Sequence, residues 1–185
     1  MTVIFANNYD IDCETLPKIW EGQPNVNLIE INKHSIDWED KVNDAIASEE
    51  DTIIFCGHGT EYGLLFPDIE KGMYILHENN VHLIKAKNVI CVWCYAANFC
   101  EHHHLKAFAT SMFISNSLEC YDNCIYGYSD EEIRENSKRF DCELGNLLEE
   151  KVPLNEWCEK LIINVDSNNA VDMFNRSGLI YYGGG

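Results

Sequence analysis

The chain has 185 residues, of which 46% are hydrophobic, so it can form one sizeable core but is short for two domains. Its 31 acidic and 13 basic side chains give a formal net charge of -18, and such a surface repels nucleic-acid phosphates and anionic lipid headgroups. We therefore expect no nucleic-acid and no membrane partner. A basic protein would instead be attracted to the acidic surface.

The N-terminus and the cysteines indicate where the protein works. Residues 1–7 lack the basic segment and the long apolar run of a signal peptide, and no stretch approaches the roughly 20 apolar residues of a membrane span. Nine cysteines is an odd number, which favours reduced thiols over a disulfide framework. We expect a cytoplasmic protein in which most cysteines are small buried apolar residues.

The first third of the chain alternates apolar and amphipathic segments. The expected elements are strands over 2–6, 27–31 and 51–56, and helices over 14–21 and 38–48. The second helix is indicated by Trp38, Val42 and Ile46, which are spaced four apart on one face. The third strand is apolar enough to be central in a sheet, and it runs directly into Gly57-His58-Gly59.

The rest of the chain continues this alternation. The expected elements are a hairpin arm over 63–68, a short helix over 79–86, strands over 87–93, 111–115 and 178–182, and helices over 98–108, 129–148 and 154–165. Ser129 followed by three acidic residues is typical of a helix start, and Pro153 interrupts the long helix. We predict one α/β domain over 1–182, with a mostly parallel sheet covered by helices, and a flexible tail over 183–185.

His58 and Cys94 are the candidates for chemistry, because each follows the carboxyl end of a predicted strand. Reacting groups gather at this edge of open α/β sheets. If the two strands are neighbours, the imidazole can take the thiol proton, and the resulting thiolate is the nucleophile. Gly57 and Gly59 permit a tight turn and leave an amide able to stabilise an oxyanion.

These motifs resemble those of a known family. Gly57-His58-Gly59, the following Gly63-Leu64-Leu65-Phe66, and the strand ending in Trp93-Cys94-Tyr95-Ala96 are similar to the caspase-fold cysteine peptidases, which include caspases, metacaspases, legumains, gingipains, clostripain and separase-like domains. The likeness covers residues 2–116 and, more loosely, the helical remainder. The bulky Trp93 and Tyr95 beside Cys94 depart from the family pattern.

The resemblance implies a three-layer sandwich and a cysteine endopeptidase with a His58-Cys94 dyad. It implies that backbone amides at Gly59 and Cys94 hold the oxyanion, and that a peptide or protein is the substrate. No cofactor is required; some members respond to calcium, but no loop here has a recognisable calcium-binding pattern.

The substrate pocket is predicted from acidic residues near the same edge. Asp10 and Asp12 follow the first predicted strand and Asp122 follows the fifth, so each is a candidate to receive a Lys or Arg side chain. We therefore expect cleavage after a basic residue.

Several alternatives remain open. A catalytically silent caspase-fold module that binds a protein through its acidic surface is the main one. A nucleotide-binding domain is disfavoured because Asn7-Asn8-Tyr9-Asp10 contains no glycine, and a phosphatase loop or Cys-x-x-Cys redox pair at Cys94 lacks the required partner residues. A zinc cluster at Cys100, Glu101 and His102-His103-His104 is disfavoured because adjacent helical side chains point in different directions. No metal site is therefore predicted.

Overall fold

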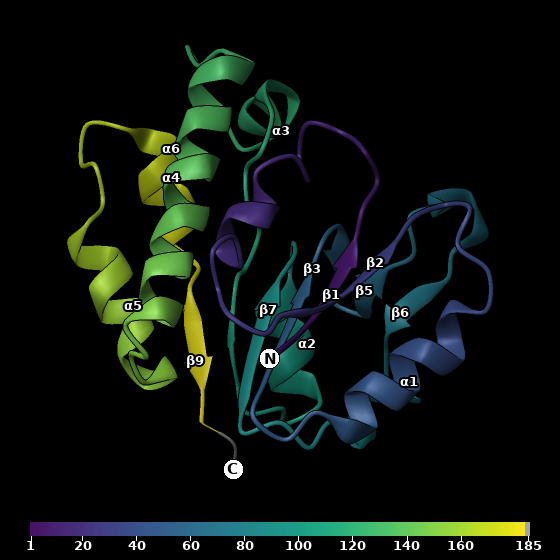
Figure 1. The fold of residues 1–185 in the computed structure, drawn as a ribbon. Helices are drawn as coiled ribbons and strands as arrows, with labels where there is room; N and C mark the ends of the chain where they lie inside the picture. The colour runs from purple at the N-terminus through teal and green to yellow at the C-terminus, as the bar shows by residue number, and fades with distance from the viewer. Residues whose placement is uncertain (184–185) are drawn as a thin grey trace.

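The centre of the computed structural model, which describes residues 1–183 without the side chain of Ile69, is a six-stranded sheet (Figure 1). In spatial order its strands are β2 (Asn27–Ile31), β1 (Thr2–Ala6), β3 (Thr52–Cys56), β7 (Asn88–Val92), β8 (Ala107–Ala109) and β9 (Ile180–Tyr182). All neighbours pair in parallel except β9, which runs antiparallel to β8. The predicted α/β class with a mostly parallel sheet is confirmed. Of the predicted tail, residues 184 and 185 lie outside the described residues.

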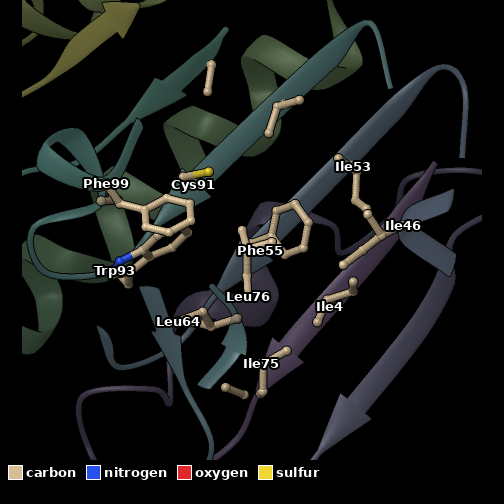
Figure 2. Close-up of a cluster of buried hydrophobic side chains, with 14 of the residues drawn as sticks. Ile4, Ile46, Ile53, Phe55, Leu64, Ile75, Leu76, Cys91, Trp93 and Phe99 are labelled. Carbon is tan, nitrogen blue, oxygen red and sulfur yellow. The ribbon is translucent and has the colours of Figure 1, made fainter. Parts of the chain in front are cut away.

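One face of the sheet is covered by two helices and a small second sheet. These elements are α1 (Trp38–Ser48), α2 (Ala96–His102), and the antiparallel strands β4 (Gly59–Thr60), β5 (Gly63–Leu65) and β6 (Tyr74–Leu76). Figure 2 shows the resulting cluster, in which the rings of Trp93 and Phe99 pack edge to face at 5.7 Å between centroids. Because both faces of β1, β3 and β7 are buried, these strands read as continuous apolar runs in the sequence.

The opposite face is covered by the C-terminal helices and one short turn. They are η1 (Leu16–Ile19), α4 (Asp130–Glu149) and α5 (Leu154–Ile163), which share a second core cluster with the sheet. Figure 1 shows α4 and α5 on the side of the sheet away from α1. The predicted Ser129 cap is confirmed, since its side chain and that of Glu132 form a reciprocal capping box. Helices therefore cover both faces of the sheet.

The region after β7 differs from the prediction. The helix expected over 98–108 ends at His102. Two residues later His104 takes a left-handed conformation (φ 52°), and β8 follows at Ala107–Ala109. The strand predicted over 111–115 is wrong. The side chain of Asn175 donates to the Ile114 carbonyl at 3.0 Å and accepts from the Ile114 amide at 2.7 Å, so this segment satisfies its backbone without a neighbouring strand.

The remaining differences concern short elements. The predicted hairpin arm over 63–68 is β5, and β4 and β6, which pair with it, were not predicted. The helix predicted over 14–21 is only η1, and the one over 79–86 is the single turn η3 (Val81–Leu83). The turn η2 (Ile69–Lys71) and the helices α3 (Ser117–Asp122) and α6 (Ala170–Ser177) were not predicted. No helix among residues 1–183 is both long and apolar enough to cross a bilayer.

Candidate functional site

The exit of β3 places His58 at the carboxyl edge of the sheet. Gly57 has a φ of 140°, and an added Cβ would lie 2.7 Å from the Ala6 carbonyl oxygen, so only glycine fits this turn. The Gly57 amide donates to the Val92 carbonyl at 3.2 Å, which keeps β3 beside β7 up to the last residue of each strand. His58 therefore begins its turn next to the end of β7.

The exit of β7 is fixed by Thr110. Its hydroxyl accepts from the Trp93 amide at 3.1 Å and donates to the Trp93 carbonyl at 2.8 Å. Tyr95 then takes a left-handed conformation (φ 67°) and donates its amide to the Ser111 carbonyl at 3.1 Å. These bonds hold Cys94 at the end of the strand, immediately before α2.

Contact between Trp93 and Gly59 holds the turn after β3 against the turn after β7. A Cβ on Gly59 would lie 2.0 Å from the Trp93 ring, so the indole lies directly over the glycine backbone. The indole Nε1–H donates to the Thr60 carbonyl at 3.1 Å. The buried indole before Cys94 thus packs in the core and fixes the position of β4.

His58 and Cys94 occupy equivalent positions and line the same cavity. Cys56 pairs with Val92, and each candidate residue follows its strand end by two positions. The cavity has a volume of about 50 Å³. Besides His58 and Cys94, polar side chains from the loop after β1, the segment after β8 and α4 line it: Asp12, Thr15, Thr110, Ser115, Ser137 and Asp141.

The Cys94 thiol is partly buried and protonated at neutral pH. Its Sγ donates to the Phe113 carbonyl at 3.5 Å. Burial, together with the negative charges of Glu119 and Asp12, raises the pKa of Cys94 to about 11. A nucleophilic role therefore requires a base that removes the proton as the thiol attacks.

His58 has a carboxylate partner on the loop after β1. Its Nε2 lies 2.8 Å from Asp10 Oδ2, with side-chain exposures of 26% and 37% respectively. Partial burial raises the pKa of Asp10, but the hydrogen bond and charge of His58 and the amide of Cys13 hold it below its usual value. Asp10, predicted to bind substrate, thus contacts the candidate base.

The backbone amides of Gly59 and Cys94, predicted to hold the oxyanion, lie just after the ends of β3 and β7. Leu65 donates to the His58 carbonyl at 2.9 Å, and Gly59 pairs with Leu64 in the next position. Hydrogen-bonded and non-bonded pairs alternate in an antiparallel ladder, so the Gly59 amide points away from β5. The Cys94 amide has no hydrogen-bond acceptor within residues 1–183. Cys94 lines the cavity that it shares with His58, whereas Gly59 does not.

The other two predicted substrate-binding residues differ in position. Asp12 lines the cavity and accepts from the side chain of Asn116 at 3.2 and 3.3 Å. Asp122 is the exposed last residue of α3 rather than a residue after a strand, and it does not line the cavity. Only Asp12 among the three carboxylates is both free of His58 and adjacent to Cys94.

The sequence reading missed the contribution of α4. Ser137 and Asp141 lie one turn apart on its buried face, and Asp141 Oδ2 accepts from the Thr15 hydroxyl at 2.6 Å. Burial raises the pKa of Asp141 to about 7. The Ser137 hydroxyl is buried without a partner in the described part of the chain. In the sequence, Ser137 and Asp141 are spaced four apart among the apolar residues Ile133, Phe140 and Leu144. This spacing places two polar side chains on the buried face of the helix.

The other cysteines and histidines are separate from the dyad. Cys56 and Cys91 are buried in the core, as expected for most of the cysteines, and Cys120 is buried in α3, whereas Cys124 is exposed. In the described residues one group of three His, Cys, Asp or Glu side chains brings its ligand atoms within 4.8 Å of one another, and it consists of Asp10, Cys13 and His58. The histidines at 102–104 do not form such a group.

A much larger groove lies elsewhere, between α2 and the β4–β6 sheet. Its volume is about 980 Å³. Its lining includes four carboxylates and an exposed aromatic ring: Glu39, Glu61, Glu78, Glu101 and Tyr62. Neither His58 nor Cys94 lines it.

Comparison with known proteins finds no matching protein-family model, no similar curated sequence and no similar solved structure. The site is therefore interpreted from its own geometry and chemistry.

Proposed function

We propose that the chain is a caspase-fold cysteine endopeptidase with His58 and Cys94 as its catalytic residues. One observation carries this proposal: the two side chains follow equivalent ends of neighbouring parallel strands and line one cavity. A mostly parallel six-stranded sheet with helices on both faces supports the proposal, and so do the Gly57-His58-Gly59 and Trp93-Cys94 segments that carry the resemblance. A base and a thiol in this arrangement are suited to acyl transfer.

The proposed reaction begins with proton transfer. His58 accepts the thiol proton as Cys94 Sγ attacks the peptide carbonyl carbon, and the Gly59 and Cys94 amides stabilise the oxyanion. His58 then donates the proton to the leaving amine as the C–N bond breaks, which leaves a thioester on Cys94. Water, deprotonated by His58, hydrolyses the thioester and restores the thiol. Asp10 holds the imidazole in one orientation throughout.

Substrate specificity is proposed to depend on Asp12, with cleavage after Lys or Arg. Asp12 contributes negative charge to the cavity beside Cys94, and the chain as a whole is strongly acidic. Fluorogenic peptides that differ only in Arg, Lys, Asp or Asn before the cleaved bond test this. Asp12→Asn should reduce the preference for Arg and Lys, and exclusive cleavage after Asp or Asn would exclude the idea.

Selective covalent labelling tests the dyad itself. A peptidyl chloromethylketone carrying Lys or Arg should modify Cys94 at neutral pH, as read by intact mass and peptide mapping. The His58→Ala variant should lose this modification, because no base remains to take the thiol proton. Exposed Cys124 provides an internal control for non-specific alkylation. A Cys94 that reacts no faster than Cys124 would contradict the proposal.

The second candidate function is a silent module that binds a basic protein segment. The acidic groove of about 980 Å³ favours it, and so does the dyad cavity of about 50 Å³, which holds a few waters but not a whole Arg side chain. A Lys-rich peptide that binds wild type, loses affinity in Glu61→Gln/Glu101→Gln and is never cleaved would support this function.

A further inference from the structure

The loop after β1 and the exit of β3 bring three metal-ligating side chains together. The Asp10 carboxylate, the Cys13 thiol and the His58 imidazole have ligand atoms that all lie within 4.8 Å of one another. Carboxylate oxygen, thiolate sulfur and imidazole nitrogen are the three ligand types that proteins use for zinc. The thiol disfavours calcium and magnesium, which take oxygen ligands.

Peptide hydrolysis does not explain why Cys13 is part of this group. Cys13 is 2% exposed, and its Sγ lies 3.8 Å from the Ala6 carbonyl oxygen. Its amide donates to Asp10 Oδ1 at 3.1 Å, so the loop already holds Asp10 and Cys13 together on one side of His58. The partly exposed His58 and Asp10 side chains leave a route for an ion from solvent.

We propose that Asp10, Cys13 and His58 bind one Zn²⁺ ion. Zinc–ligand bonds of 2.0–2.3 Å at tetrahedral angles place ligand atoms about 3.3–3.8 Å apart. Asp10 Oδ2 and His58 Nε2, now 2.8 Å apart, need only a small separation to admit the ion. On binding, the Cys13 thiol releases its proton to solvent, and a water molecule takes the fourth position.

Zinc bound to His58 prevents this residue from acting as the base for Cys94. This consequence rests on the proposed function. A neutral imidazole that binds zinc through Nε2 carries its proton on Nδ1. Such a ring cannot accept a proton from Cys94. Bound zinc therefore inhibits attack by Cys94 without touching the sulfur.

Zinc binding is measured with untagged, metal-free protein by equilibrium dialysis and by competition with a chromogenic chelator. Wild type should bind one ion per chain. Cys13→Ala and Asp10→Asn should each weaken binding at least 10-fold, and Co²⁺ in place of Zn²⁺ should give a thiolate charge-transfer band that Cys13→Ala abolishes. Circular dichroism and thermal unfolding show whether each variant is folded.

Three matched variants distinguish zinc binding at Asp10, Cys13 and His58 from zinc binding at other thiols or histidines. Cys94→Ser, Cys124→Ser and His102→Asn/His103→Asn should bind zinc as wild type does. Because Cys94→Ser lacks the proposed thiol nucleophile, its zinc binding does not depend on whether the protein is a peptidase, so the two proposals fail independently. Unchanged binding in folded Cys13→Ala, or binding lost only in Cys94→Ser or in the histidine variant, overturns the proposed site.

Chloromethylketone labelling tests the consequence. Zinc should slow labelling of Cys94 in wild type, and a chelator should restore it. In Cys13→Ala the same zinc concentration should have at least 10-fold less effect. Equal slowing in both proteins would place the ion directly on Cys94 and overturn the proposal.

Discussion

His58 and Cys94 each stand two residues beyond a paired position, Cys56 on β3 and Val92 on β7. Parallel pairing with no register shift therefore brings the ends of the two strands to the same level, and both side chains line one cavity. The Gly57–Val92 hydrogen bond extends this pairing into the turn. The shared level of the two strand ends is a consequence of strand register, and changes that disturb the two turns should abolish the proposed dyad.

The raised pKa of Cys94 predicts slow alkylation at neutral pH by iodoacetamide, which lacks the peptide that would hold a chloromethylketone beside His58 and Cys94. Burial and nearby carboxylates disfavour the thiolate, so the rate of iodoacetamide modification at Cys94 should rise with pH to a midpoint near 11. Peptide mapping across a pH series, with N-acetylcysteine as the reference thiol, measures this. His58→Ala should leave the midpoint unchanged. A midpoint near or below 7 in wild type would indicate a preformed thiolate–imidazolium pair instead.

Replacing Asp10 with Asn should impair catalysis more than binding. The amide can still accept from the Cys13 backbone, but it no longer provides the charge that orients His58. We expect kcat for a peptide substrate to fall on the order of 100-fold with little change in KM. Because the hydrogen bond and charge of His58 hold the pKa of Asp10 below its usual value, its contribution should be lost only as pH falls below the usual range of an aspartate.

Asp122→Asn is the matched control for this substitution, because Asp122 is exposed at the end of α3. It should retain wild-type kcat and KM. Equal effects of the two substitutions would show that general loss of acidity, rather than the Asp10–His58 contact, lowers the rate.

Gly59→Ala should displace Trp93. The new Cβ would lie 2.0 Å from the indole ring, so either the ring or β4 must move. We expect a loss of about 1–3 kcal/mol in the free energy of unfolding and a loss of Cys94 labelling. Gly183→Ala, where the nearest atom to the new Cβ is 3.9 Å away, should change stability by less than about 0.5 kcal/mol. Urea unfolding of both variants makes the comparison.

Asp141→Asn should stabilise the protein, and more so at high pH. The folded state holds a proton on Asp141 up to about pH 7, whereas the unfolded chain releases it near pH 3.8. Fewer protons are bound in the unfolded state, so this residue lowers stability as pH rises from about 4 to 7. The stability gain in the variant should be about 2–3 kcal/mol larger at pH 8 than at pH 5.

The same substitution has a local reason to be tolerated. An amide at position 141 still accepts from the Thr15 hydroxyl, and its NH₂ group lies one helical turn from the unpartnered Ser137 hydroxyl. Chemical denaturation at the two pH values measures the effect. A variant that is equally destabilised at both would show that Asp141 is needed as a charged group.

Buried strands were predictable because their residues are apolar on both faces. The segments at β1, β3 and β7 follow directly from such runs, and the helix α1 follows from four-residue spacing. β8 was missed because Ala-Phe-Ala is short and has no β-branched residue, whereas residues 111–115 look more like a strand. Asn175, which is distant in sequence, bonds both backbone groups of Ile114, so residues 111–115 do not pair as a strand.

The candidate site was predictable only where a local motif marked it. Gly57-His58-Gly59 and Cys94 stand directly after apolar strands, so their position follows from the parallel topology. The Asp10–His58 contact depends on the path of the loop after β1, and the cavity walls at Ser137 and Asp141 depend on how α4 packs. Neither is encoded in a short segment, so sequence alone assigned Asp10 to the substrate and overlooked Asp141.

Cleavage of a defined peptide library tests the central claim most directly. Wild-type protein, freed of metal by a chelator, is incubated with the library beside Cys94→Ser, and new peptide termini are identified by mass spectrometry. The account predicts new termini that follow Lys or Arg with wild type and none with Cys94→Ser. Termini produced equally by both proteins, or no cleavage by wild type that is folded and metal-free, would contradict it.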